Sequence, residues 1–272
     1  MAAATAPPSD AILLEFQPPF AIITFNQPQK KNALDSTLYQ RLSSILQQVD
    51  RRSDVFITVV TGKGDFFSAG ADVKAAREGF LGEDARIASL GRLSESNMDL
   101  TRSFYNHSKI LVAGLNGPAI GLSAALLGHF DFVYAVENAY FLTPFAAISL
   151  VAEGGASLSL VQRMGIAKAN EALIMGKKLS VKELLPSGFV TGLFPPSSAE
   201  VFRASLLKTL EEQFDGLELE SCVGIKKLIR QAQPNPEETN VREVFAGAER
   251  FATGKPQARF SQLAAKKMRH KI

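Results

Sequence analysis

The segment Asn116–Leu126 (NGPAIGLSAAL) constrains the fold of this chain more than any other stretch. It follows the continuous apolar run Ile110–Leu115, which is typical of a buried strand. Gly117 and Gly121 permit a tight turn, and the small residues that follow predict the start of a helix. The segment offers a ligand only its backbone N–H groups, which stabilise negative charge when they lie at a helix N-terminus.

A second segment, Phe66–Asp72 (FFSAGAD), follows the β-branched run Val55–Val60 and has the same architecture. Its aromatic residues are suited to bury the base of a loop, Gly70 permits a tight turn, and Asp72 stands where a helix would begin. Taken alone, this is a plain strand-to-helix turn. Two such turns at neighbouring strand ends can aim two N–H groups at one point, which is the geometry of an oxyanion hole.

Strand and helix patterns alternate over the first 195 residues, which predicts an α/β fold with a largely parallel sheet. The runs Ile12–Phe16 and Phe20–Phe25 predict a hairpin, and Asp35 is expected to cap a helix. Residues 77–92 are polar and without pattern, which predicts a mobile segment near the site. We therefore expect a core domain over residues 1–195 and a helical C-terminal region over residues 196–272.

Composition excludes several classes of protein. With 272 residues and 46% hydrophobic content the chain can bury a sizeable core, yet no apolar run is long enough for a membrane span. The formal charge is +3, and its excess lies near the C-terminus, at Lys266, Lys267, Arg269 and Lys271. No nucleic-acid motif accompanies these residues, so we expect a solvated tail, or one that meets a phosphorylated small ligand, rather than nucleic-acid binding.

The single cysteine, Cys222, excludes an intrachain disulfide and indicates a reducing compartment. His107, His129 and His270 are scattered without the spacing of metal ligands. We therefore expect no metal site, and we expect His107 and His129 to be structural or surface residues.

Three segments together carry a resemblance. Lys30–Leu34 (KKNAL), Ser68–Asp72 (SAGAD) and Asn116–Gly121 (NGPAIG) resemble the crotonase (enoyl-CoA hydratase/isomerase) superfamily in order and spacing, over roughly residues 12–195. The resemblance implies a spiral of ββα units and a C-terminal helical region that builds homotrimers, sometimes stacked as hexamers. It also implies an acyl-CoA thioester as the substrate and no further cofactor.

By the same resemblance, the backbone N–H groups of Ala71 and Leu122 would hold the thioester oxygen of the substrate. The residues that would line the path of the CoA thioester are Lys31, Ala33, Leu34, Ala69, Gly70, Ala71, Asp72, Val73, Gly121 and Leu122.

The family's hydratases use two glutamates, and the matching positions here are Ala125 and Phe145, neither of which can move a proton. Glu153 remains, between an apolar stretch and Gly154-Gly155, and could serve as a helix cap or as a general base. Its position matches the catalytic glutamate of Δ3,Δ2-enoyl-CoA isomerases, and Ile148–Gly155 (ISLVAEGG) resembles their fungal peroxisomal form.

Asn97 shares one helix face with Leu93, Leu100 and Phe104, at spacings of four, three and four residues. A buried amide needs a hydrogen-bond partner. This partner could be a backbone carbonyl; alternatively, the amide could point into the acyl pocket and orient Glu153 or a water. The fungal isomerases carry an asparagine at this spacing, which favours the second role.

The function we expect is Δ3,Δ2-enoyl-CoA isomerisation in the β-oxidation of unsaturated fatty acids, with Glu153 moving a proton from C2 to C4. One alternative is another crotonase reaction such as dienoyl-CoA isomerisation, which uses an additional acid. Another is a non-catalytic acyl-CoA-binding partner of an isomerase.

The C-terminal tripeptide His270-Lys271-Ile272 is loosely similar to the Ser-Lys-Leu peroxisomal address. By itself it is an ordinary basic tail. With the isomerase resemblance we expect a peroxisomal protein that a peroxisomal import receptor recognises, with the mitochondrion or cytosol as alternatives.

Overall fold

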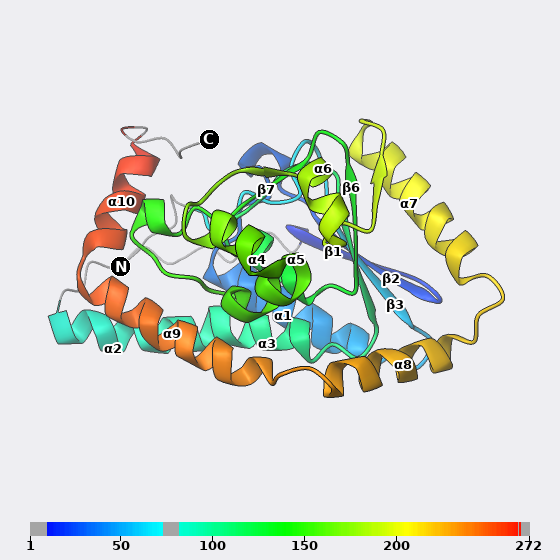
Figure 1. The fold of residues 1–272 in the computed structure, drawn as a ribbon, viewed down its shortest axis with the longest axis horizontal. Coiled ribbons are helices and arrows are strands. Elements are labelled where there is room, and N and C mark those ends of the chain that lie inside the picture. Colours follow the sequence, from blue (N-terminus) through cyan, green and yellow to red (C-terminus); the bar gives the residue numbers. More distant parts are fainter. Residues whose placement is uncertain (1–9, 73–81, 266, 268–272) are drawn as a thin grey trace.

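The computed structural model describes residues 10–72, 82–265 and 267 (Figure 1). Its strands are β1 (Ile12–Gln17), β2 (Phe20–Phe25), β3 (Ile57–Gly62), β4 (Ile110–Leu115), β5 (Ala119–Ile120), β6 (Phe132–Val136), β7 (Tyr140–Leu142), β8 (Leu179–Ser180) and β9 (Gly192–Phe194). Its α-helices are α1 (Ser36–Asp50), α2 (Gly82–Leu93), α3 (Asp99–Tyr105), α4 (Leu122–Ala125), α5 (Ala156–Leu173), α6 (Val181–Leu184), α7 (Ala199–Phe214), α8 (Leu219–Gln231), α9 (Pro236–Ala252) and α10 (Lys255–Ala264). Shorter helical turns are η1 (Pro28–Lys30), η2 (Ser94–Met98), η3 (Leu126–His129), η4 (Ala146–Ile148) and η5 (Leu185–Ser187).

The predicted α/β fold is confirmed. The main sheet has the strand order β1-β2-β3-β4-β6-β9, in which β1 is antiparallel to β2 and the later pairs are parallel. A smaller sheet has the order β5-β7-β8. Every residue of β2, β3 and β4 is buried, as expected of parallel strands that are covered on both faces.

Local sequence explains how the first helix begins and which face it buries. The Asp35 carboxylate accepts a hydrogen bond of 2.9 Å from the Leu38 N–H, so the predicted cap is present. Leu42, Ile45 and Val49 then bury one face of α1.

Helix α2 corrects the expectation for residues 77–92. Residues 82–92 belong to a helix rather than to a mobile segment, while residues 77–81 lie outside the described residues. The apolar pattern of α2 is weak because small residues face α9, which runs alongside it (Figure 1). Ala85 and Ser89 are buried, and a Cβ on Gly247 of α9 would lie 3.3 Å from Leu93 Cδ1. This close approach, which the sequence does not display, holds α2 in place.

The interior forms two clusters. The larger surrounds the main sheet and includes Phe202 and Leu206 of α7. The smaller lies under the C-terminal helices and contains Leu93, Ile148, Val244, Ala248, Phe251 and Phe260. The division of the chain at residue 195 stays a prediction. Within the described ranges, no helix is both long and apolar enough to cross a membrane.

Candidate active site

The two glycine loops meet at the end of the main sheet. Ser68 and Ala119 form a parallel bridge, and the Ile120 N–H donates to the Ser68 carbonyl at 2.9 Å. Gly70 has a φ of 79°, and a Cβ there would lie 2.5 Å from the Ile120 carbonyl oxygen. Only glycine therefore fits where the two backbones touch.

The N–H groups of Ala71 and Leu122 are left available by this arrangement. The Leu34 N–H donates to the Gly70 carbonyl at 2.8 Å, and the Asp72 N–H donates to the Leu34 carbonyl at 2.9 Å. In this parallel pairing Leu34 bonds the residues on either side of Ala71, namely Gly70 and Asp72. The Ala71 N–H therefore points away from Leu34. Leu122 is the first residue of α4, where an N–H has no acceptor within the helix. Neither N–H has a hydrogen-bond partner among the residues that the structure describes.

Polar side chains of the motifs hold the loops. Asn116 accepts from the Gly62 N–H at 3.0 Å and donates to the carbonyls of Gly64 and Phe66. Asn32 also donates to the Phe66 carbonyl, at 2.7 Å. These amides fix the backbone, so the N–H groups of the loops are pre-organised.

Glu153 is held by Asn97. The Asn97 amide donates to Glu153 Oε2 at 2.8 Å. Of the two partners expected for this amide, the structure therefore shows the Glu153 carboxylate rather than a backbone carbonyl. Asn97 belongs to η2, a π-helical turn between α2 and α3, a feature that often marks functional sites. Ser96 Oγ donates to the Arg92 carbonyl at 2.6 Å and lies 3.2 Å from Asn97 Oδ1.

The segment after Glu153 lies directly against the second glycine loop. Gly154 has a φ of 75°, and a Cβ there would lie 2.8 Å from Leu122 Cδ1 and 3.2 Å from Ala125 Cβ. Ala125 is fully buried. Its small side chain therefore makes the room in which the backbone beside Glu153 passes the Leu122 loop.

One cavity of about 100 Å³ lies between the first glycine loop and the Asn97–Glu153 pair, and its described lining does not include Gly121 or Leu122 of the second loop. It is lined by Leu34, Asp35, Ser36, Tyr39, Ala71, Asp72, Arg92, Leu93, Ser96, Asn97, Leu150, Glu153, Phe251 and Phe260. The Arg92 guanidinium lies 5.0 Å from the Phe251 ring centroid, and burial lowers the pKa of Arg92. Asp35 and Asp72 add two carboxylates, of which Asp72 lies 3.5 Å from Lys30 Nζ.

Not every residue of the expected CoA path reaches this cavity. Leu34, Ala71 and Asp72 line it, whereas its described lining does not include Lys31, Ala33 or Ala69. The Lys31 ammonium instead lies 4.8 Å from the Phe66 ring centroid, and the Ala69 N–H donates to the Lys31 carbonyl. Gly121 has a φ of 64° before α4, and Val73 lies outside the described residues. The ligand-binding roles of all these residues stay predictions.

Sequence reasoning missed two buried polar side chains near Glu153, Asn240 and Glu243 of α9. His129, which was expected to be structural or at the surface, is buried and bonds the Gly154 carbonyl. Burial raises the pKa of Glu243, and burial lowers the pKa of His129 to about 4. A signal was present in the sequence, because Asn240, Glu243, Val244 and Gly247 recur with helical spacing on what is otherwise an apolar face.

Within the described part of the chain, no group of three or more His, Cys, Asp or Glu side chains is placed to hold a metal ion.

Comparison with known proteins places this geometry in context. Residues 15–242 match the family model for enoyl-CoA hydratase/isomerase. A Delta(3,5)-Delta(2,4)-dienoyl-CoA isomerase of Pyricularia oryzae is 43% identical over 97% of this chain and 100% of its own length. A 3,2-trans-enoyl-CoA isomerase of Saccharomyces cerevisiae is 35% identical over 97% of this chain and 98% of its own.

Two further matches extend the comparison. A mouse protein named Enoyl-CoA delta isomerase 3, peroxisomal, is 34% identical over 89% of this chain and 74% of its own. The crystal structure of an enoyl-CoA hydratase/isomerase from Pseudoalteromonas atlantica superposes with a TM-score of 0.79 at 28% identity, over 96% of this chain and 100% of that one.

Proposed function

Because this chain belongs to the enoyl-CoA hydratase/isomerase (crotonase) family and to its enoyl-CoA isomerases, we propose that Glu153 is the base that moves its substrate's double bond. One observation carries this proposal. The Glu153 carboxylate, held by Asn97 at 2.8 Å, shares a cavity with Ala71, whose N–H lacks a partner in the described part of the chain.

In the proposed reaction the thioester oxygen accepts hydrogen bonds from the N–H groups of Ala71 and Leu122. Glu153 removes a proton from C2, and the negative charge of the resulting conjugated enolate, a dienolate from a 3-enoyl thioester or a trienolate from a 3,5-dienoyl thioester, develops on the thioester oxygen. Donors that are already in place lower the barrier most where charge develops, and one donor is worth about 10²–10³ in kcat. Glu153 or a second acid then returns a proton further along the acyl chain.

Hydration does not fit this site. Ala125 and Phe145 occupy the positions of the two hydratase glutamates, and both are buried apolar side chains. Neither can activate water.

The substrate that we place first is a 3,5-dienoyl-CoA, in which the proton returns at C6 to give the 2,4-dienoyl isomer. Its support is the 43% identity to the Pyricularia enzyme over that enzyme's whole length. Sequence analysis placed this reaction second because it uses an additional acid, and neither hydratase position carries one. Asp35 and Asp72 line the same cavity as Glu153, so either carboxylate is a candidate for that additional acid.

The second candidate is a 3-enoyl-CoA, in which the proton returns at C4 to give the 2-trans isomer. It is the reaction that sequence analysis placed first. The Glu153–Asn97 pair supports it, because one carboxylate can serve both C2 and C4. The 35% identity to the yeast enzyme adds to that support.

The test offers both thioesters, with equal chain length, to wild type and to Glu153→Gln, and follows the conjugated product by ultraviolet absorbance. Deuterium from heavy water then marks C4 or C6. We expect turnover that Glu153→Gln abolishes, while Glu212→Gln, an exposed glutamate on α7, leaves it unchanged. Undiminished turnover in Glu153→Gln would refute the base. Acyl-CoA binding without turnover of either thioester by wild type would favour a non-catalytic binding partner.

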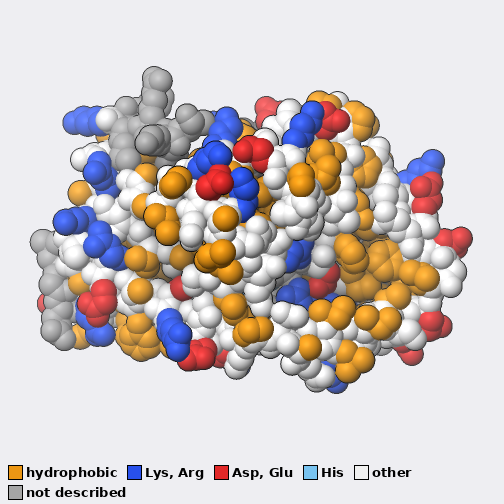
Figure 2. Space-filling view, in the orientation of Figure 1, with side chains coloured by type: hydrophobic (Ala, Val, Ile, Leu, Met, Phe, Trp, Pro, Cys, Tyr) orange, Lys and Arg blue, Asp and Glu red, His pale blue; other side chains and the backbone are white. Residues whose placement is uncertain are grey.

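We further propose that the chain assembles as a homotrimer or a hexamer. Ile225, Leu228 and Ile229 of α8 are each more than half exposed. Ile225 and Ile229 also border a mainly apolar hollow of about 540 Å³ beside Phe132 and Phe214. Figure 2 shows hydrophobic side chains gathered around this end of the molecule. Light scattering should give a trimeric or larger mass for wild type and a smaller mass for Leu228→Glu.

We propose the peroxisome as the place of action and a peroxisomal import receptor as a partner. The name of the mouse relative, Enoyl-CoA delta isomerase 3, peroxisomal, supports this proposal. Imaging of the chain with a fluorescent protein at its N-terminus tests this location. Signal in the mitochondrion or the cytosol would contradict it. The tripeptide His270-Lys271-Ile272, on which the expectation rested together with the isomerase resemblance, lies outside the described residues.

A further inference from the structure

Helix α9 reaches the backbone beside both members of the Asn97–Glu153 pair. The Asn240 amide donates at 3.0 Å to the carbonyl of Met98, the residue that follows Asn97. Three residues further along the same helix, Glu243 Oε2 accepts from the Gly155 N–H at 2.7 Å. Gly155 lies two residues after Glu153. One helix thus fixes the chain next to each side chain of the pair.

Both polar groups of one peptide unit, Gly154–Gly155, are held from opposite sides. Its N–H donates to Glu243, and its carbonyl accepts from His129 Nε2 at 2.8 Å. Gly154 and Gly155 both have positive φ, at 75° and 69°. A glycine pair leaves the intervening peptide free to rotate at little cost. The two buried partners remove that freedom just beyond Glu153.

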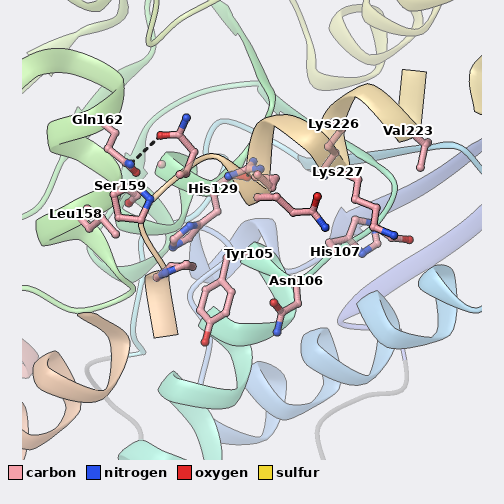
Figure 3. A pocket seen from close by; sticks show the side chains of 17 residues that line it. Tyr105, Asn106, His107, His129, Leu158, Ser159, Gln162, Val223, Lys226 and Lys227 are labelled. Carbon is pink, nitrogen blue, oxygen red and sulfur yellow. Dashed lines mark hydrogen bonds between the residues drawn. The ribbon is translucent and has the colours of Figure 1, made fainter. Parts of the chain in front are cut away.

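His129 contacts Tyr105 of α3, which in turn is hydrogen-bonded to α9. Its ring packs edge-on against Tyr105, with centroids 5.8 Å apart, and the Tyr105 hydroxyl donates to Glu237 at 2.6 Å. Figure 3 shows His129 and Tyr105 together on the wall of a cavity of about 460 Å³. Burial lowers the pKa of His129 to about 4, so at neutral pH its imidazole is uncharged and carries the Nε2 proton toward Gly154.

We propose that Asn240 and Glu243 are positioning residues, which act through the backbone at Met98 and Gly155 to set the hydrogen bond between Asn97 and Glu153. The inference rests on the proposed role of Glu153 as the base. The competing explanation is that Glu243 only stabilises the fold. Glu243 also accepts hydrogen bonds from the N–H and the hydroxyl of Ser157, and it thereby caps α5. The two explanations differ in what happens to kcat when the fold is intact.

The first experiment compares Glu243→Gln with Glu238→Gln, the same chemical change at an exposed position of α9 whose partner is Arg242. Glutamine keeps the size of the side chain but offers only one acceptor oxygen to two backbone donors. We expect kcat of Glu243→Gln to fall about 10-fold or more, because misplacing a reacting group by about 1 Å can cost about 10²-fold. The affinity for a saturated, unreactive acyl-CoA should stay within about 2-fold, and Glu238→Gln should match wild type.

The second experiment tests whether the effect passes through the Asn97–Glu153 bond. In an Asn97→Ala background that bond is absent, so Glu243→Gln should lower kcat by no more than about 2-fold. A full further loss in that background would overturn the proposal, as would unchanged kcat in folded Glu243→Gln. Asn240→Ala should show the same dependence on Asn97.

Should Glu243→Gln fail to fold, His129 gives the same answer. His129→Gln keeps an N–H donor for the Gly154 carbonyl, whereas His129→Leu does not. We expect the glutamine variant to retain several-fold more kcat than the leucine variant. Equal kcat in the two folded variants would refute the proposal that the hydrogen bond to the Gly154 carbonyl positions the Gly154–Gly155 peptide for catalysis.

The last measurement separates this inference from the proposed function. Hydrogen exchange of the Gly155 amide, followed by NMR, should be at least about 10-fold faster in Glu243→Gln than in wild type. If wild type turns over neither thioester, the proposed function fails, but the exchange rate still decides whether Glu243 holds the peptide. Unchanged exchange would overturn the inference whatever the activity.

Discussion

Replacing Gly70 by alanine tests whether the contact between the two glycine loops creates the oxyanion hole. A methyl group at Gly70 would lie 2.5 Å from the Ile120 carbonyl oxygen and 3.4 Å from Gly121 Cα. Ordinary van der Waals contacts begin at about 3.4 Å, so the Ile120 carbonyl would have to move away by nearly 1 Å. Ile120 and Gly121 lead directly into Leu122, so this movement carries one proposed N–H donor away from the other.

The expected magnitude has two parts. The φ of 79° at Gly70 is unfavourable for alanine and costs about 1–3 kcal/mol of stability. The displaced donor costs about 10²–10³ in kcat, the value of one oxyanion donor. Gly188→Ala isolates the first part, because Gly188 has a φ of 74° and nothing lies within 4 Å of a Cβ there.

The assay measures kcat with a 3,5-dienoyl-CoA and a 3-enoyl-CoA, together with the melting temperature of each variant. Gly188→Ala should lose stability and keep kcat, whereas Gly70→Ala should lose both. A folded Gly70→Ala variant whose kcat lies within a few-fold of wild type would refute the role assigned to this loop contact.

Three further predictions concern other parts of the structure. Asp131→Asn should lower the free energy of unfolding by about 3 kcal/mol in denaturant titrations, because it leaves Lys226, 2.7 Å away and largely buried, without its counter-ion. Burial lowers the pKa values of His107 and His129 from 6.5 to about 4, so the folded state binds fewer protons. Each histidine should contribute up to about 3 kcal/mol to the free energy of unfolding above pH 6.5, and this contribution should be lost as the pH falls toward 4. In denaturant titrations across this range, His129→Gln should remove about half of the pH dependence. Ala125→Glu should yield no hydratase activity and should lower isomerase kcat, measured in the same absorbance assay, since the new carboxylate would displace Gly154.

The sequence was most informative where structure depends on local backbone geometry. Gly70 and Gly121 predicted the two turns, and both have the positive φ that glycine permits. Asp35 predicted the start of α1 because an N-cap needs only residues within one turn. The apolar segment before Glu153 left a helix cap and a general base equally open, and only the resemblance to the catalytic glutamate of enoyl-CoA isomerases favoured the base.

The parts that could not be predicted depend on contacts between distant segments. Phe251 and Phe260 line the cavity around Glu153, and Glu243 bonds Gly155, 88 residues earlier. Helical periodicity places Glu243 on a buried face of α9, but it does not say which backbone group that face meets. Likewise, α2 has too weak an apolar pattern to be recognised, because its packing against α9 relies on small residues.

The site therefore consists of two parts with different origins. The proposed oxyanion loops depend on strand ends and glycines, and their N–H groups would suit any thioester chemistry that places charge on oxygen. The proposed base depends on tertiary contacts, because Glu153 lies on a segment that passes over Ala125 and is held through Gly155 by α9. A Cβ on Gly154 would already lie 3.2 Å from Ala125 Cβ, so a carboxylate at position 125 would crowd the present path of Gly154. We therefore expect the choice of base to depend on the packing of α9 on the core, while the loops proposed to bind the thioester can stay the same.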